Sequence, residues 1–247
     1  MKKNVLYISL TSFIFLIILL VILKISISKV NQWNKNNKEN ENIQEKLKET
    51  AIIQENNNED DSKDYKVNFE SLKNINSDTI GWLEVPGTNI NYSVVHTNNN
   101  DYYLTHNFYK NYNKSGWIFV DESNKLDGND KNTVIYGHNV RDNSMFGSLK
   151  KVITPEWYDN EENYKIKLIT ENEEKIYKVF SVYQIEAEDY YIQTEFDSNK
   201  QFEQFIETLQ KRSIKNFNEK VTTENQILTL STCANNNKYR IVLHAKI

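Results

Sequence analysis

The N-terminal part of the chain is strongly apolar. Residues Val5 to Leu23 form an almost unbroken apolar run, and about 19 residues are enough to cross a hydrocarbon core as a helix. Lys2 and Lys3 precede the run, and positive charge favours the cytoplasmic side of a membrane. We therefore predict a single-pass anchor over residues 1–29, with a cytoplasmic N-terminus and an extracellular domain. A cleaved signal peptide is the alternative, but no small-residue cleavage site follows the run.

The next stretch, residues 30–64, is very polar. It is rich in Asn, Glu, Lys and Gln, and it holds too few apolar groups to build a core. The composition predicts either a stalk that lifts a domain off the membrane or a disordered linker, and it leaves both open. Ile43, Leu47 and Ala51 recur every four residues, which favours a short helix within this stretch.

From about Tyr65 the pattern is that of a folded domain, which we place at residues 65–247. Short runs rich in β-branched and aromatic residues alternate with turn residues, which is typical of strands. Apolar residues at i, i+3, i+4 and i+7 predict an amphipathic helix around Phe202 to Leu209, and a shorter helix is expected around Phe69 to Ile75. Many short strands with few helices indicate a mostly β domain, either a closed or a nearly closed barrel. The predicted strand regions are 82–95 with a Pro-Gly turn, 117–120, 133–136, 164–170, 175–183, 226–233 and 239–247.

Composition narrows the function classes. The formal net charge is -4, which gives no electrostatic footprint for nucleic acid. The single cysteine excludes an intramolecular disulfide, so an extracellular thiol here is either reactive or an intermolecular link. The four histidines lack the paired spacing of metal ligands, so we predict no metal site.

The C-terminal segment carries the most chemical information. The predicted strand 226–233 runs directly into the only cysteine, Cys233, and the next strand begins at Tyr239. A connection this short normally joins antiparallel neighbours, so we expect Cys233 and Arg240 side by side at one rim of the sheet. A guanidinium beside a thiol favours the thiolate and offers donors to an oxyanion on an attacked carbonyl.

A thioester mechanism also needs a group that moves protons, and histidine is the usual choice at neutral pH. His138 directly follows Gly137 at the end of the predicted strand 133–136, so we expect it at a barrel rim. We therefore select it as the candidate partner of the cysteine.

The other histidines are interpreted as structural. His96 and His106 lie in loops rich in Asn and Tyr and are expected to be solvated. His244 lies about 13 Å along the strand from Arg240, so it is interpreted as a partly buried or surface strand histidine. Side-chain alternation places one set of the last strand on a polar face and the other on the core face. The polar-face set is Arg240, Val242, His244 and Lys246, and the core set is Ile241, Leu243, Ala245 and Ile247.

Two motifs resemble those of the sortase family. Thr229-Leu-Ser-Thr-Cys233 with a downstream Arg240 resembles the sortase cysteine signature, and Tyr136-Gly-His-Asn139 resembles the sortase histidine segment. The resemblance covers about Phe69 to Ile247, with Ser93 where a Pro is usual and a short loop between Cys233 and Arg240. Further segments that resemble class B sortases in particular are Gly81–Tyr92, Asn100–Leu104, Gly116–Asp121 and Ser144–Leu149.

The resemblance implies a fold and a reaction. The fold is an eight-stranded sortase-type β-barrel with N-terminal helices and a helix in the loop before the seventh strand. The reaction is cleavage of a C-terminal sorting signal in secreted proteins, after the Thr of an Asn/Ser-Pro-x-Thr motif. The thioacyl-enzyme then passes its cargo to an amine of peptidoglycan or of its lipid-linked precursor.

The resemblance also assigns roles to residues. By motif match, Cys233 is the nucleophile, His138 the acid/base and Arg240 the oxyanion and substrate contact. Ser231 matches a position that contacts substrate. The looser match at Tyr190 and Tyr191 suggests residues that line the groove. Class B members generally bind no calcium, so no cofactor is expected.

Two alternatives remain. A papain-like wall hydrolase also uses Cys and His, but there the Cys opens a helix and precedes the His, whereas here His138 comes first and Cys233 ends a strand. The second alternative is a non-catalytic surface-binding or pilus-assembly module that keeps the fold.

Overall fold

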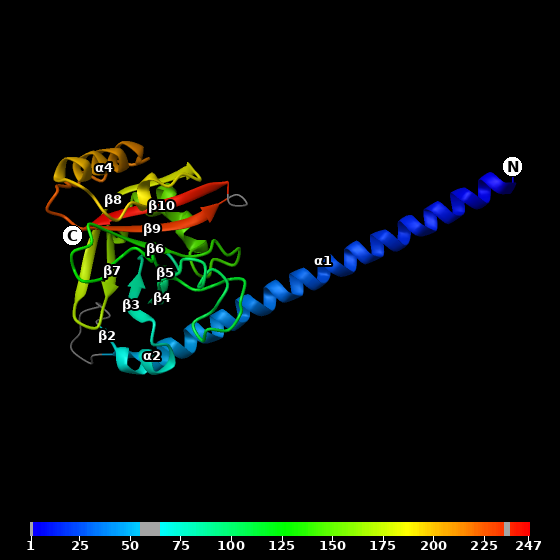
Figure 1. Ribbon diagram of the computed structural model, residues 1–247, viewed down its shortest axis with the longest axis horizontal. Helices are drawn as coiled ribbons and strands as arrows, with labels where there is room; N and C mark the ends of the chain where they lie inside the picture. Colours follow the sequence, from blue (N-terminus) through cyan, green and yellow to red (C-terminus); the bar gives the residue numbers. More distant parts are fainter. Residues whose placement is uncertain (1, 55–64, 235–237) are drawn as a thin grey trace.

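The computed structural model describes residues 2–54, 65–234 and 238–247, and the side chains of residues 12–53, 65–232 and 238–247. A long helix, α1 (Lys2–Ala51), leads from the N-terminus to a β-rich body that contains the other elements (Figure 1). The short strands β1 (Ile52–Gln54) and β2 (Tyr65–Val67) pair antiparallel after it. The remaining helices are α2 (Phe69–Ile75), η1 (Gly147–Ile153), α3 (Pro155–Tyr158), η2 (Glu161–Tyr164), η3 (Tyr190–Ile192) and α4 (Asn199–Arg212).

Eight strands close into a barrel in the order β10-β8-β7-β3-β4-β5-β6-β9. The β4–β5 and β6–β9 pairs are parallel, and the other pairs are antiparallel. Helix α4 lies between β8 and β9, the seventh strand of the barrel along the chain, so the predicted barrel and its helical insertion are confirmed. The barrel strands are β3 (Thr79–Glu84), β4 (Asn91–His96), β5 (Phe119–Val120), β6 (Asn132–Tyr136), β7 (Lys165–Ile169), β8 (Glu174–Glu186), β9 (Ile227–Ala234) and β10 (Tyr239–Lys246).

Strand β10 is buried on both of its faces. Ile241, Leu243 and Ala245 belong to the main core, as their alternation predicted. Ile247, which was predicted with them, lies just past the end of the strand and is 42% exposed, so that part of the prediction is wrong. Val242 on the opposite face is also fully buried, because α4 packs across the outside of the barrel over β8 and β10 (Figure 1). His244 on the same face is fully buried too, next to the rings of Phe180, Tyr183 and Tyr191. The expectation of a partly buried or surface His244 is therefore wrong: aromatic side chains of β8 and η3 cover it.

The C-terminal part of α1 packs on the body. Ile43 is 3% exposed and Leu47 and Ala51 are 0% exposed, so the four-residue repeat marked the face that joins the core. Residues 36–51 therefore form part of the folded body as a helix rather than a free stalk or a disordered linker. The boundaries predicted at residues 29 and 64 remain predictions, and residues 55–64 lie outside the described part.

The N-terminal part of α1 projects away from the body (Figure 1). It contains a window with a mean hydropathy of 2.6 that is 0% buried, and it is long and apolar enough to cross a membrane. The helix is therefore a candidate anchor at one end and a packed element of the domain at the other.

The packing of α1 gives a stability prediction. We expect Leu47→Ala to lower the free energy of unfolding by about 2–5 kcal/mol, because the substitution leaves a cavity in the core. Lys46→Ala on the exposed face of the same helix is the control and should change stability by less than about 0.5 kcal/mol. Denaturant unfolding measures both variants, and equal stabilities would show that this face of α1 is not packed.

Candidate active site

The strand that carries the cysteine lies between the two strands that carry the other candidate groups. β9 pairs with β6 on one side and with β10 on the other. β6 leads into His138 at its C-terminal end, and β10 begins one residue before Arg240. Because β6 and β9 run in parallel and β10 runs back, the end of β6, the end of β9 and the start of β10 meet at one rim of the barrel.

Cys233 and Arg240 are opposite each other in the β9–β10 ladder. The predicted antiparallel pairing is therefore confirmed at the level of the backbone, while the side chain of Cys233 lies outside the described residues. The Arg240 side chain is half-buried, and its Nη1 donates a hydrogen bond to the carbonyl oxygen of Tyr239 at 3.1 Å.

The parallel register continues past the end of β6. Tyr136 is opposite Ser231, and the Thr232 hydroxyl donates to the Gly137 carbonyl oxygen at 2.6 Å. His138 and Cys233 each lie two residues beyond the Tyr136–Ser231 pair. This register brings the backbone of the predicted histidine alongside that of the predicted nucleophile.

The His138 ring is held by a loop that the sequence did not identify as functional. Its Nε2 lies 2.8 Å from the carbonyl oxygen of Leu104, which can only accept, so the neutral ring carries its proton on Nε2 and leaves Nδ1 unprotonated. Gly116 lies against the ring and has a φ of 57°. A Cβ there would be 3.0 Å from His138 Cδ2 and 2.3 Å from the carbonyl oxygen of Tyr103, so only glycine fits.

Of the predicted substrate contacts, Ser231 and Tyr191 are brought together. They are 3% and 2% exposed, and their hydroxyl oxygens are 3.0 Å apart. Tyr190 is half-buried, and its hydroxyl donates to that of Tyr183 at 2.9 Å. Both tyrosines belong to η3, so this short helix is tied to the barrel by its side chains. Contact of any of the three with substrate stays a prediction.

A buried network of hydrogen bonds continues from the Tyr183 hydroxyl. The Tyr183 hydroxyl lies 2.8 Å from His244 Nε2, and His244 Nδ1 lies 2.9 Å from the Thr229 hydroxyl. Thr229 donates its proton to Asn132 Oδ1 at 2.6 Å, so its oxygen must accept from His244 Nδ1–H. His244 Nε2 then accepts from Tyr183, and every polar atom of the ring is satisfied in the neutral state.

The same hydrogen-bond network returns to the η3 loop. The Asn132 side-chain amide donates to the carbonyl oxygens of Tyr191 and Gln193, at 3.2 and 2.9 Å. Sequence reasoning missed this network because its members come from five separate segments. Its only sequence signal is a row of polar residues on strands that are otherwise apolar.

Burial of His244 predicts a pH dependence of stability. Desolvation lowers the pKa of His244 to about 3, whereas an unfolded histidine titrates near about 6.5. The unfolded state therefore binds more protons between these values, so stability falls as pH drops below about 6.5, by up to ~1.4 kcal/mol per unit. His244→Gln should remove this part of the slope in denaturant unfolding between pH 7 and 5. An identical slope in the variant would contradict the assignment.

The other two histidines are not the solvated residues that the sequence suggested. His106 is half-buried and stacks on Tyr102 with ring centroids 4.2 Å apart, and its Nδ1 lies 2.8 Å from the Tyr102 carbonyl oxygen. His96 is the half-buried last residue of β4. His106 is held by local packing, and neither histidine lies on the strands that carry Cys233 or Arg240.

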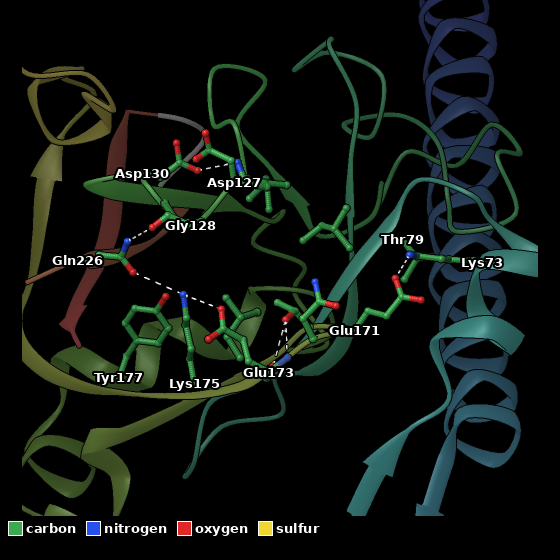
Figure 2. Close-up of a pocket in the computed structure, with 17 residues that line it drawn as sticks. Lys73, Thr79, Asp127, Gly128, Asp130, Glu171, Glu173, Lys175, Tyr177 and Gln226 are labelled. Atoms are coloured by element: carbon green, nitrogen blue, oxygen red, sulfur yellow. Dashed lines mark hydrogen bonds and ion pairs between the residues drawn. The ribbon is translucent and has the colours of Figure 1, made fainter.

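The pocket in Figure 2, of about 500 Å³, is separate from the candidate site. It is lined by acidic and basic side chains that include Asp130, Glu173 and Lys175. Gln226, another lining residue, directly precedes β9, so Cys233 is seven residues further along an extended strand, about 23 Å away. None of the predicted site residues lines this pocket. Among the described residues, no group of three or more His, Cys, Asp or Glu could hold a metal ion.

Comparisons with known proteins found similar sequences. A family model described as a sortase domain matches residues 83–247. Sortase B of Listeria monocytogenes is 35% identical over 182 residues, which is 72% of this chain and 73% of that protein. Sortase B of Staphylococcus aureus is 37% identical over 185 residues, 72% of this chain and 74% of that protein.

Solved structures are similar as well. Clostridium perfringens sortase B is 37% identical with a TM-score of 0.68, and the match covers 72% of this chain and 98% of that one. Bacillus anthracis sortase B in complex with AAEK1 is 34% identical with a TM-score of 0.74, covering 86% of this chain and 97% of that one.

Proposed function

The chain belongs to the sortase family of cysteine transpeptidases, and on that premise we propose that Cys233, His138 and Arg240 carry out its reaction. The observation that carries the proposal is the place of β9 between β6 and β10, with Cys233 opposite Arg240 and in register with His138. This arrangement supplies a nucleophile, a proton carrier and a cation at a single rim.

The first half-reaction forms a thioester. The Cys233 thiol first gives its proton to Nδ1 of His138. The resulting thiolate attacks the carbonyl carbon of the scissile peptide bond, and the Arg240 guanidinium stabilises the negative charge on the carbonyl oxygen. The C–N bond then breaks, and the leaving amine takes a proton from His138. Because Nε2 is held by Leu104, we assign this proton transfer to Nδ1.

The second half-reaction reverses these roles. An acceptor amine gives a proton to His138 as it attacks the thioester carbonyl carbon. The new amide bond forms, and the thiolate of Cys233 leaves. No cofactor or oxidant enters, since bonds are exchanged between acyl acceptors at constant oxidation state.

We assign the substrate from the class of the relatives. The donor is a secreted protein with an Asn/Ser-Pro-x-Thr signal near its C-terminus, cleaved after Thr, and the acceptor is an amine of peptidoglycan or its lipid-linked precursor. Ser231, Tyr190 and Tyr191 are assigned to the support and lining of the donor groove. The support for this assignment is the class B identity of the matched relatives and the tie between η3 and β9.

We further propose the membrane arrangement predicted by the sequence. Residues 1–29 anchor the chain with the N-terminus inside the cell, and the catalytic domain faces the growing wall outside. The apolar, unburied N-terminal part of α1 supports this arrangement.

Peptide cleavage tests the nucleophile. The detergent-solubilised full chain should cleave Asn-Pro-x-Thr and Ser-Pro-x-Thr peptides after Thr, and mass spectrometry should detect the thioester on the wild-type protein. Cys233→Ala should produce neither product nor adduct. Cleavage by the Ala variant would remove Cys233 from the mechanism.

The oxyanion role of Arg240 has a separate test. Arg240→Ala should lower kcat by ~10²-fold or more, the loss typical of one oxyanion donor. Arg240→Lys keeps the charge but not the forked donors, so it should recover only part of the rate. Steady-state kinetics on the same peptide measures both variants, and a wild-type kcat in Arg240→Ala would refute the role.

A further inference from the structure

The part of α1 that packs on the body presents amide side chains to the interface. Asn36, Asn37, Asn40 and Gln44 are 4, 5, 0 and 5% exposed. Their spacing places them on the same helix face as the buried Ile43. Buried amides are costly unless they are hydrogen-bonded, so their partners show what this face recognises.

Two of these side chains, Asn37 and Asn40, bind one loop of the barrel domain. Asn40 Nδ2 donates to the carbonyl oxygen of Gly116 at 2.9 Å, and Asn40 Oδ1 accepts from the Asn113 side chain at 3.0 Å. The same Asn113 amide donates to the Asn36 carbonyl oxygen at 3.0 Å. The Ser115 hydroxyl donates to Asn37 Oδ1 at 2.6 Å.

The loop that α1 binds also holds His138. Gly116 contacts the His138 ring, as described above, and the backbone N–H of Trp117 donates to the Tyr103 carbonyl oxygen at 2.9 Å. That bond joins residues 113–117 to the segment whose Leu104 carbonyl oxygen fixes His138 Nε2. The loop therefore lies between α1 on one side and the imidazole on the other.

We propose that Asn40, with its neighbours on α1, is a positioning residue for His138. It fixes the Gly116 and Leu104 backbone against the ring, and so holds the Nε2–H tautomer. The functional meaning rests on the acid/base role proposed for His138, whereas the positioning itself is a statement about geometry.

The proposal links the membrane anchor to catalysis. Only residues 30–35 separate the predicted anchor from Asn36, and they continue the helix for about 9 Å. One uninterrupted helix thus carries the apolar segment and the amides that hold the histidine loop.

Two variants on one helix test the proposal in the full-length protein. Asn40→Ala removes both side-chain contacts to the loop, whereas Asn42→Ala, on the exposed face, is the matched control. We expect Asn40→Ala to lower kcat roughly tenfold or more, because small displacements of catalytic groups are costly, with KM within about twofold. Asn42→Ala should match wild type in both constants.

A second readout does not depend on catalysis. In protein labelled with ¹⁵N-histidine, the Nε2–H signal of His138 is identified by its loss in His138→Gln. This signal should exchange with solvent faster in Asn40→Ala than in Asn42→Ala. If no variant cleaves peptide, the proposed function fails, but the exchange rates still decide the positioning.

The overturning result is a folded Asn40→Ala with the wild-type kcat and the wild-type exchange rate of His138. If Asn40→Ala does not fold, Ser115→Ala replaces it, since that variant removes only the contact to Asn37. It should shift kcat and the exchange rate in the same direction by a smaller factor. Wild-type values in a folded Ser115→Ala would then overturn the proposal.

Discussion

The structure depends on the closure of the barrel through β9. This strand completes two ladders at once, a parallel one with β6 and an antiparallel one with β10. Closing a sheet satisfies backbone donors and acceptors that an open edge would leave unpaired. The same hydrogen bonds fix the register of three strand ends, so the barrel's stability and the alignment of His138, Cys233 and Arg240 have one physical origin.

Buried polar side chains fix the positions of two loops that the strand ladders do not constrain. On one side, Asn132, Thr229 and His244 tie the η3 loop to the barrel through buried hydrogen bonds. On the other side, Asn40 ties the histidine loop to α1. Both networks are largely buried. Because a buried polar group without a hydrogen bond costs free energy, each network favours one arrangement of its loop.

Sequence reasoning recovered what local patterns encode. Alternation gave the strands, and the short connection between Cys233 and Arg240 gave their pairing. It failed where a distant element decides the environment. His244 was placed at or near the surface because nothing in β10 reveals that aromatic side chains of β8 and η3 cover it. The buried face of α1 around Asn40 went unnoticed, because its Asn and Gln residues lie in a very polar stretch and were expected to be exposed to solvent. The hold of Leu104 on His138 is a backbone contact, and no side-chain pattern encodes it.

The central claim is that the ends of β6 and β9 lie side by side with Cys233 next to position 138. His138→Cys adds one thiol to a chain that has a single cysteine, and mild oxidation followed by intact-mass measurement detects an intramolecular disulfide. Neighbouring strands place Cα atoms within disulfide range, so the account predicts rapid and nearly complete bridging. Gln226→Cys, about 23 Å from Cys233 along the same extended strand, should not bridge. A His138→Cys variant that folds and stays reduced, or forms only intermolecular dimers, would contradict the account.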